Sequence, residues 1–249
     1  MADVTLTYKG STIAEMNTTG SKTLKTSGKY CEGDIGVSYV KPEGGTSDEL
    51  AKKMITGEGD ITELPSGITK IRNGAFYNCK NLALTSLPSG ITKIYDYTFY
   101  GCTNLALTSL PETITEIGNY AFYFCTNLAL TSLPNTITKI SHYAFSGCTN
   151  LALTSIPETI TEIGSSAFYF CTNLALRSLP VGIKIIDNAF NGCTGLTSIT
   201  FKGTPTSISS NAFTNCTNLT NIYVPWAEGA VANAPWGATN ATIHYNTTT

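Results

Sequence analysis

Apolar and polar positions alternate along most of the chain in a pattern that returns about every 23 residues. Runs such as NLALTSLP and ITEIG place Leu or Ile at nearly every second position, with Thr, Ser, Asn or Glu between them. Alternation of this kind predicts short β-strands with one buried face. The apolar positions of one representative unit are Leu105, Leu107, Leu110, Ile114, Ile117, Ala121, Phe122 and Cys125.

Cysteine, phenylalanine, proline and leucine keep one common register through the repeat. Successive cysteines are 23, 23, 23, 23, 22 and 23 residues apart, and a phenylalanine precedes each of them by three residues. Because one unit of this size cannot bury its apolar face alone, the period predicts a solenoid, placed at residues 59–225. The predicted core consists of Cys79, Cys102, Cys125, Cys148, Cys171, Cys193 and Cys216, with Phe76, Phe99, Phe122, Phe145, Phe168, Phe190 and Phe213.

Each coil is predicted to contain two short strands, a corner at its proline and a tight turn at AFxxC. No segment of the repeat is long enough for an ordinary amphipathic helix. If neighbouring coils pair like strands, the rise is roughly 4.8 Å per coil. The predicted fold class is therefore mainly β.

The pattern CxxL…P…ITxIGxxAFxxC resembles the BspA-like leucine-rich repeats of bacterial surface proteins. This resemblance implies a right-handed leucine-rich-repeat solenoid used for adhesion or protein recognition, without catalysis. The family strand usually has the form LxxIxIP, whereas the five copies between Cys79 and Pro180 have LALTSLP or, in the last two, its variants LALTSIP and LALRSLP. A shift of one residue turns a strand side chain to the opposite face, so we expect a bulge or a broken strand in these copies.

The two ends of the chain lie outside the repeat. Residues 1–41 form a predicted small β module, whose thin core favours contact with another subunit or a larger assembly. Residues 42–58 are predicted to be a linker and a short capping helix, and residues 226–249 an irregular cap and tail. Trp226 and Trp236 are expected to close the last coil, with a sugar-stacking pair as the alternative. A Thr-rich module followed by such repeats looks like gut-bacterial prophage and tail-associated proteins.

The row of cysteines could be a disulfide framework, a metal ladder, a set of reactive thiols or a set of compact packing groups. Equivalent side chains in stacked coils point the same way, which disfavours disulfides, and a linear row does not offer tetrahedral metal ligands. Packing is therefore the favoured interpretation. Cys31 lies outside the row, and the sequence leaves its state open.

Charged residues make up only 13% of the chain, and the net charge is -2. No basic block is present, so we expect no nucleic acid partner. The sequence has neither a recognisable signal peptide nor an apolar stretch that suits membrane insertion. The expected location is extracellular, on a cell surface or in a virion. Charges at equivalent repeat positions could form a ladder that fixes the register, namely Lys70, Lys93, Glu116, Lys139 and Glu162.

Candidate catalytic groups are few. The two histidines, His142 and His244, lie in no motif, and neither a nucleophile elbow, a zinc-protease helix motif nor a phosphate-binding glycine loop occurs. We therefore predict no catalytic residues, no metal site, no cofactor and no enzymatic activity.

Aromatic residues crowd around the AFxxC turn, on both sides of the core phenylalanine. They predict an exposed aromatic strip that suits a protein or glycan partner, although the same rings could merely shield the coil edges. The candidate binding residues are Tyr77, Tyr100, Tyr123, Tyr143, Tyr169, Phe124 and Phe170.

Two functions follow from these patterns. The first is a recognition or adhesion protein that presents a repetitive Thr- and Tyr-rich surface to a protein or glycan. The alternative is a structural virion or tail component, in which the solenoid is a spacer and the N-terminal module anchors the chain or forms a homo-oligomer.

Overall fold

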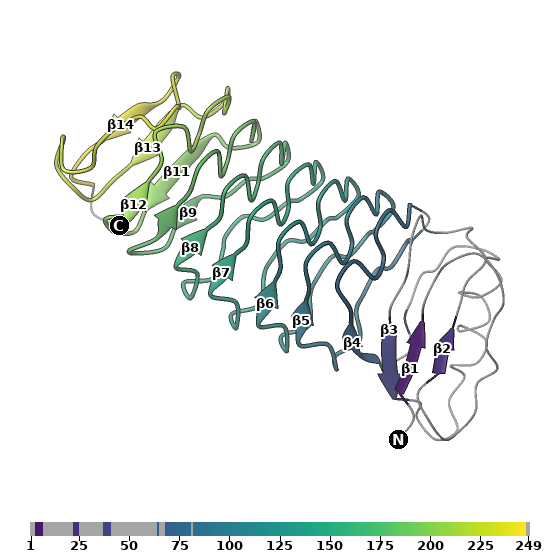
Figure 1. The fold of residues 1–249 in the computed structure, drawn as a ribbon. Coiled ribbons are helices and arrows are strands. Elements are labelled where there is room, and N and C mark those ends of the chain that lie inside the picture. Colours follow the sequence, from purple (N-terminus) through teal and green to yellow (C-terminus); the bar gives the residue numbers. More distant parts are fainter. Residues whose placement is uncertain are drawn as a thin grey trace.

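The computed structural model describes residues 64, 68–80 and 82–247, together with the backbone of residues 3–6, 22–24 and 37–40. Its main part is an elongated stack of coils that runs from β4 to β14 (Figure 1). Strands of successive coils pair in parallel, with partners such as Lys93 and Glu116 23 residues apart. The predicted mainly β solenoid is thus confirmed. The predicted linker and capping helix, residues 42–58, lie outside the described residues.

Fourteen strands are described, all of them two to four residues long. The first four are β1 (Asp3–Leu6), β2 (Lys22–Leu24), β3 (Val37–Val40) and β4 (Ile68–Ile71). The next six are β5 (Lys93–Ile94), β6 (Glu116–Ile117), β7 (Lys139–Ile140), β8 (Glu162–Ile163), β9 (Ser178–Leu179) and β10 (Lys184–Ile185). The last four are β11 (Ser198–Phe201), β12 (Ser207–Ile208), β13 (Asn221–Tyr223) and β14 (Thr242–His244).

One strand per coil comes from the ITEI segment of the repeat. These strands form the pair β5-β6 and the sheet β12-β10-β8-β7, with parallel pairing throughout. In each of them the isoleucine is buried and the preceding charged or polar residue points outward, as alternation requires. This side of the stack is called the strand face below.

The second predicted strand of each coil is regular only near the C-terminal end. There β14-β13-β11-β9 form one sheet, and β11 shows strict alternation of half-buried and buried positions. Within residues 83–177 the only strands are β5, β6, β7 and β8, so the LALTSLP copies have the predicted break. The cause lies in the core, because Leu107 is buried five residues after its cysteine, whereas Ile199 is buried six residues after its own.

The core is a continuous column along the stack. The seven repeat phenylalanines are fully buried, and their rings stack with centroids 5.1–5.6 Å apart and interplanar angles of 7° or less. Each buried phenylalanine removes a large apolar surface from water, which contributes about 1.5–3 kcal/mol.

The two ends extend the sheets of the stack. β3 pairs with β4 antiparallel, so the strands within residues 1–41 join the sheet that begins the solenoid. At the other end β14 pairs with β13, so the stack continues one strand into the segment expected to be an irregular cap. Trp226 and Trp236 are buried there, and both contact the ring of Phe201.

Candidate recognition surface

The AFxxC turns form one side of the solenoid, here called the turn face. It comprises residues 97–104, 120–127, 143–150, 166–173, 188–195 and 211–218, the same eight repeat positions in six coils. Backbone N–H groups of each turn donate to carbonyls of the next coil, as from Phe122 to Ala144 and from Phe124 to Ser146, both at 2.8 Å. The turns are therefore fixed to each other, and their outward side chains have defined positions.

Buried cysteines anchor these turns from inside. The thiol of Cys148 donates to the carbonyl oxygen of Phe122 at 2.9 Å, and the same bond recurs for the thiols of Cys102, Cys125, Cys171, Cys193 and Cys216 at 2.9–3.0 Å. Burial raises the pKa of all six thiols, to about 12 for Cys216. Cys79, the first of the row, is buried but disulfide-bonded, which corrects the expectation of a packing thiol at that position.

The six free cysteines should be inert in the folded chain, because the reactive thiolate forms only at a pH near the raised pKa. We expect a thiol-alkylating reagent at pH 8 to leave these six unmodified and to label them all in denaturant. Peptide mass spectrometry assigns each label to its cysteine. Labelling of Cys125 or Cys171 in the native chain would contradict the packing role.

Tyrosines form two stacked columns on the turn face, and the first column extends to Tyr77 in the coil that precedes it. Tyr77, Tyr100 and Tyr123 form the first, with ring centroids 4.5 and 4.7 Å apart. The second contains Tyr97, Tyr120 and Tyr143, with centroids 5.0 and 4.7 Å apart. Tilted contacts between Tyr97 and Tyr100 and between Tyr120 and Tyr123 join the columns.

Two phenylalanines project from the same face. Phe124 and Phe170 precede their cysteines and are 50% and 45% exposed, whereas the core phenylalanines are fully buried. Each ring contacts the tyrosine before it, Tyr123 or Tyr169, with centroids 4.7 Å apart. Exposed aromatic groups of this kind are typical of binding surfaces.

The structure therefore gathers the candidate residues into two groups. Tyr77, Tyr100, Tyr123, Tyr143 and Phe124 belong to one continuous aromatic cluster, and Tyr169 with Phe170 forms a second cluster two coils further along. Tyr97 and Tyr120 complete the first cluster but were not among the candidates. Both occupy the repeat position of Tyr143, and all three have a positive φ, of 57°, 54° and 55°.

No Asp, Glu, Lys or Arg occurs in the eight turn-face positions of the six coils defined above. Partial burial, and then the neighbouring phenols, raises the pKa of Tyr100 and Tyr120 above the usual tyrosine value. Both phenols thus remain neutral at physiological pH. The turn face combines aromatic, hydroxyl and amide groups without formal charge.

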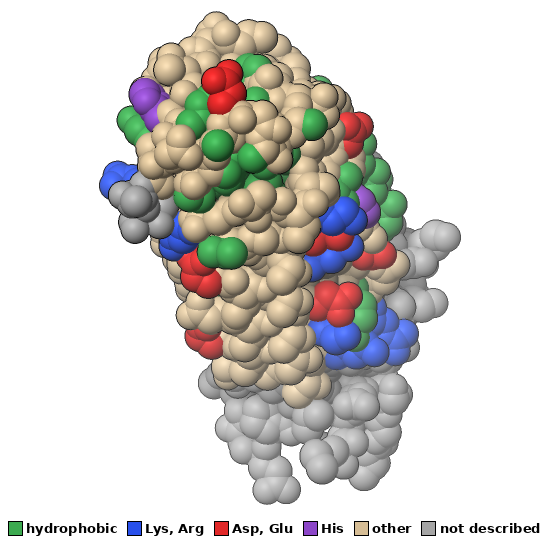
Figure 2. Space-filling view, turned by 90° about the vertical axis from the view of Figure 1, so that its left-hand side faces the viewer, with side chains coloured by type: hydrophobic (Ala, Val, Ile, Leu, Met, Phe, Trp, Pro, Cys, Tyr) green, Lys and Arg blue, Asp and Glu red, His purple; other side chains and the backbone are tan. Residues whose placement is uncertain are grey.

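The strand face has the opposite character. Lys93 pairs with Glu116 at 2.8 Å, and Glu162 pairs with Lys139 at 2.5 Å and Lys184 at 3.1 Å. Lys70 lies over the ring of Tyr95 instead, 5.4 Å from its centroid. In Figure 2 basic and acidic side chains lie next to one another along one side of the molecule. The predicted charge ladder is therefore present within these pairs of coils. It is interrupted once, because the described contacts include no ion pair between Glu116 and Lys139.

Replacing Glu162 by glutamine should remove both ion pairs. Hydrogen bonds from Lys139, and then from Lys184, hold the pKa of Glu162 below its usual value despite its partial burial. Because the folded-state pKa is lowered, the stabilisation is present above the unfolded-state pKa and is lost as the pH falls through the folded-state pKa. We expect a loss of about 1 kcal/mol at pH 7 and none in acid, measured by urea unfolding. Glu112→Gln, at an exposed residue without a described ion pair, is the control, and an equal loss there would contradict the assignment.

A shallow depression of about 420 Å³ lies on the strand face between β6 and β7, which are not paired. Glu116, Lys139, Ser141 and His142 are among its lining residues. His142 accepts a hydrogen bond at Nδ1 from the backbone N–H of Ser165 at 2.9 Å. Its role is thus a contact between coils, in a ladder where Asp96 and Asn119 accept in the same way.

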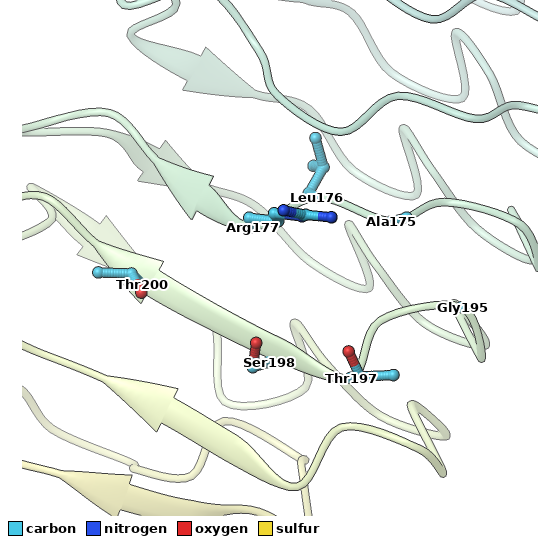
Figure 3. Close-up of a pocket in the computed structure, with 7 residues that line it drawn as sticks. All are labelled: Ala175, Leu176, Arg177, Gly195, Thr197, Ser198 and Thr200. Atoms are coloured by element: carbon cyan, nitrogen blue, oxygen red, sulfur yellow. The ribbon is translucent and has the colours of Figure 1, made fainter.

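A second depression, of about 410 Å³, lies beside β9 and β11 where the strand register changes (Figure 3). Arg177 lies across it from Thr197, Ser198 and Thr200. Its lining contains no carboxylate or histidine that could act as a general acid or base. It contains none of the candidate aromatic residues either.

Two further searches concern only the part of the chain that the structure describes. No three His, Cys, Asp or Glu side chains lie together in a way that could hold a metal ion. None of its elements is a helix long and apolar enough to span a membrane.

Comparison with known families identifies the repeat. The model of the BspA type leucine-rich repeat region matches residues 60–175 and 177–228, in six copies. Because the match covers more than half of the chain, the chain belongs to this leucine-rich-repeat family. No curated protein matches the sequence.

Three solved structures are similar to this chain. A leucine-rich repeat protein of T. pallidum is 32% identical over 57% of this chain and 71% of its own, with a TM-score of 0.48. A leucine-rich repeat protein from Bacteroides ovatus is 25% identical over 74% of this chain and 61% of its own, with a TM-score of 0.40. A leucine-rich cell surface protein from Faecalibacterium prausnitzii is 28% identical over 68% of this chain and 60% of its own, with a TM-score of 0.38. The chain thus spans about 60% of the latter two.

Proposed function

We propose that this chain is a non-enzymatic recognition protein that acts at a cell surface and binds its partner through the turn face. The aromatic clusters on a face without charge are the observation that carries the proposal. Membership of the BspA-type family agrees with a binding or adhesion role. The repeated inter-coil hydrogen bonds support it as well, because rings held in place lose little conformational freedom on binding.

The strand face is the less suitable surface for such a role. Its charged side chains already pair with one another. A partner could use these charges only after the paired side chains part from each other and lose their bound water. The turn face offers ring surfaces together with neutral amide and hydroxyl groups instead. Several of these groups bond to the neighbouring coil, as from the Thr126 hydroxyl to the Thr103 carbonyl at 3.3 Å and from the Asn173 amide to Asn150 at 3.5 Å. A partner bound there would gain apolar burial without separating ion pairs.

A binding screen against cell surfaces and an array of glycans tests this proposal. Tyr100→Ala, Tyr123→Ala and Tyr169→Ala should each weaken binding, by about tenfold where the ring is central to the contact. Glu112→Gln, on another side of the coil, should leave binding unchanged. If all three tyrosine variants bind like the wild type, the aromatic face is not the binding surface.

A further inference from the structure

Phe124 and Phe170 occupy a position at which the backbone favours glycine or asparagine. The residue before the cysteine has φ between 54° and 76° in every described coil, and bulky side chains are uncommon there. Along the stack this position is filled in turn by Asn78, Gly101, Phe124, Gly147, Phe170, Gly192 and Asn215. Large rings at such a position, half exposed and outside the core, point to a function other than folding.

Both rings lie flat on the backbone of the following coil. A Cβ atom at Gly147 would lie 3.0–3.2 Å from three atoms of the Phe124 ring, and one at Gly192 would lie 3.1–3.2 Å from the same three atoms of Phe170. The absence of a side chain at these glycines thus lets each ring cover the next coil with one face. The remaining exposure of each phenylalanine leaves the outer side of its ring open to a ligand.

The two rings form a matched pair. They occupy equivalent positions two coils apart, so the rise of paired strands places them about 10 Å apart along the solenoid axis. One disaccharide of an extended β-1,4-linked glycan has nearly this length. Such a chain presents an apolar C–H face that can stack on an aromatic ring at every second sugar.

The surroundings of the rings suit sugar hydroxyl groups. Asn127, Asn150 and Asn173 are exposed in three successive coils, just beyond the cysteines of the same turns. Their amides can both donate and accept hydrogen bonds. A nucleic acid would require basic residues to neutralise its phosphates, and the turn face has none. A protein interface would favour one continuous apolar centre, whereas polar residues of the coil at 143–150 separate these rings.

We propose that Phe124 and Phe170 form a two-ring platform for an uncharged β-1,4-linked hexopyranose chain that runs along the solenoid axis. Each ring lies under one sugar, with one further sugar between them. The asparagine row beside the rings binds the sugar hydroxyls. This inference rests on the proposed function and specifies its ligand class.

Isothermal titration calorimetry of the full chain with cellohexaose and hexa-N-acetylchitohexaose tests the platform, with the α-linked maltohexaose as the contrast. We expect binding of at least one β-1,4-linked hexasaccharide, and at least tenfold weaker binding of maltohexaose and of the corresponding disaccharide, which reaches only one ring. Phe124→Ala and Phe170→Ala should each weaken binding about tenfold, which is about 1.4 kcal/mol. Phe124→Tyr keeps the ring and should retain affinity, as should Val181→Ala, which removes apolar atoms from a residue that is 66% exposed elsewhere.

Two results would overturn the platform: no binding of either β-1,4-linked hexasaccharide, or unchanged binding by the Phe124→Ala/Phe170→Ala double variant. Parallel assays on cell surfaces, before and after digestion with cellulase and chitinase, which cleave β-1,4-linked chains, separate this failure from that of the proposed function. If the chain binds both surfaces equally and the tyrosine variants do not, the partner is not a β-1,4-linked glycan and only the glycan inference fails. If the chain binds neither surface, the proposed function fails as well.

Discussion

Replacing Phe145, one of the equivalent core phenylalanines of the middle coils, by alanine is expected to destabilise the chain by about 3–5 kcal/mol. Its ring is fully buried in a middle coil and stacks on Phe122 at 5.4 Å and Phe168 at 5.6 Å. Its removal leaves a cavity inside the column that neighbouring rings cannot fill, because hydrogen bonds between turns hold each coil in place. Urea unfolding followed by circular dichroism measures the change.

Phe124→Ala is the matched control, since it removes the same ring from a half-exposed position directly before the buried Cys125. It should cost less than about 1 kcal/mol. Equal losses in the two variants would show that the stacked column does not dominate the stability of the solenoid.

The second large effect is expected at Gly164, where alanine should cost about 1–3 kcal/mol. An added Cβ would lie 2.8 Å from the backbone nitrogen of His142 and 2.9 Å from the carbonyl carbon of Ser141. These are backbone atoms, which cannot rotate away as a flexible side chain could. The hydrogen bond from Gly164 N–H to the Ile140 carbonyl, 2.8 Å long, would have to lengthen.

Gly182→Ala separates this steric cost from the cost of backbone conformation. Nothing lies within 4 Å of a Cβ at Gly182, but its φ is +67°, so alanine there should cost about 1 kcal/mol through backbone strain alone. Thermal unfolding of both variants gives the comparison. A milder effect at Gly164 than at Gly182 would mean that the coils can separate to admit the methyl group.

The architecture could be predicted from the sequence because equivalent residues have the same structural role in every coil. Cys125 and Phe122 recur at a fixed spacing, and only a stack of equivalent coils gives each of them the same surroundings. The break in the LALTSLP copies was also predictable, since moving a leucine by one position changes the face to which it points. Strand lengths were not predictable, because isolated backbone hydrogen bonds, as from Ala106 to Leu84 and from Ala129 to Leu107, join the LALTSLP segments without a regular ladder.

The candidate surface was predictable only in outline. The sequence places aromatic residues on both sides of Phe122, but the direction of each ring depends on φ values such as the 54° of Phe124. The flat placement of that ring depends on Gly147 in the next coil, 23 residues away. The inter-coil hydrogen bond of His142 likewise depends on Ser165 in the next coil, so the sequence of a single repeat unit does not indicate it.

The most direct test of the account compares two charge-introducing double variants of the same coils in binding to a cell surface. Phe124→Glu/Phe170→Glu places two charges on the turn face, and Ser109→Glu/Ser155→Glu places two on another exposed side. We expect the first to weaken binding at least 100-fold, because binding would bury two unpaired carboxylates, and the second to change it less than threefold. Equal effects, or a greater loss in the serine variant, would contradict the claim that the turn face binds the partner.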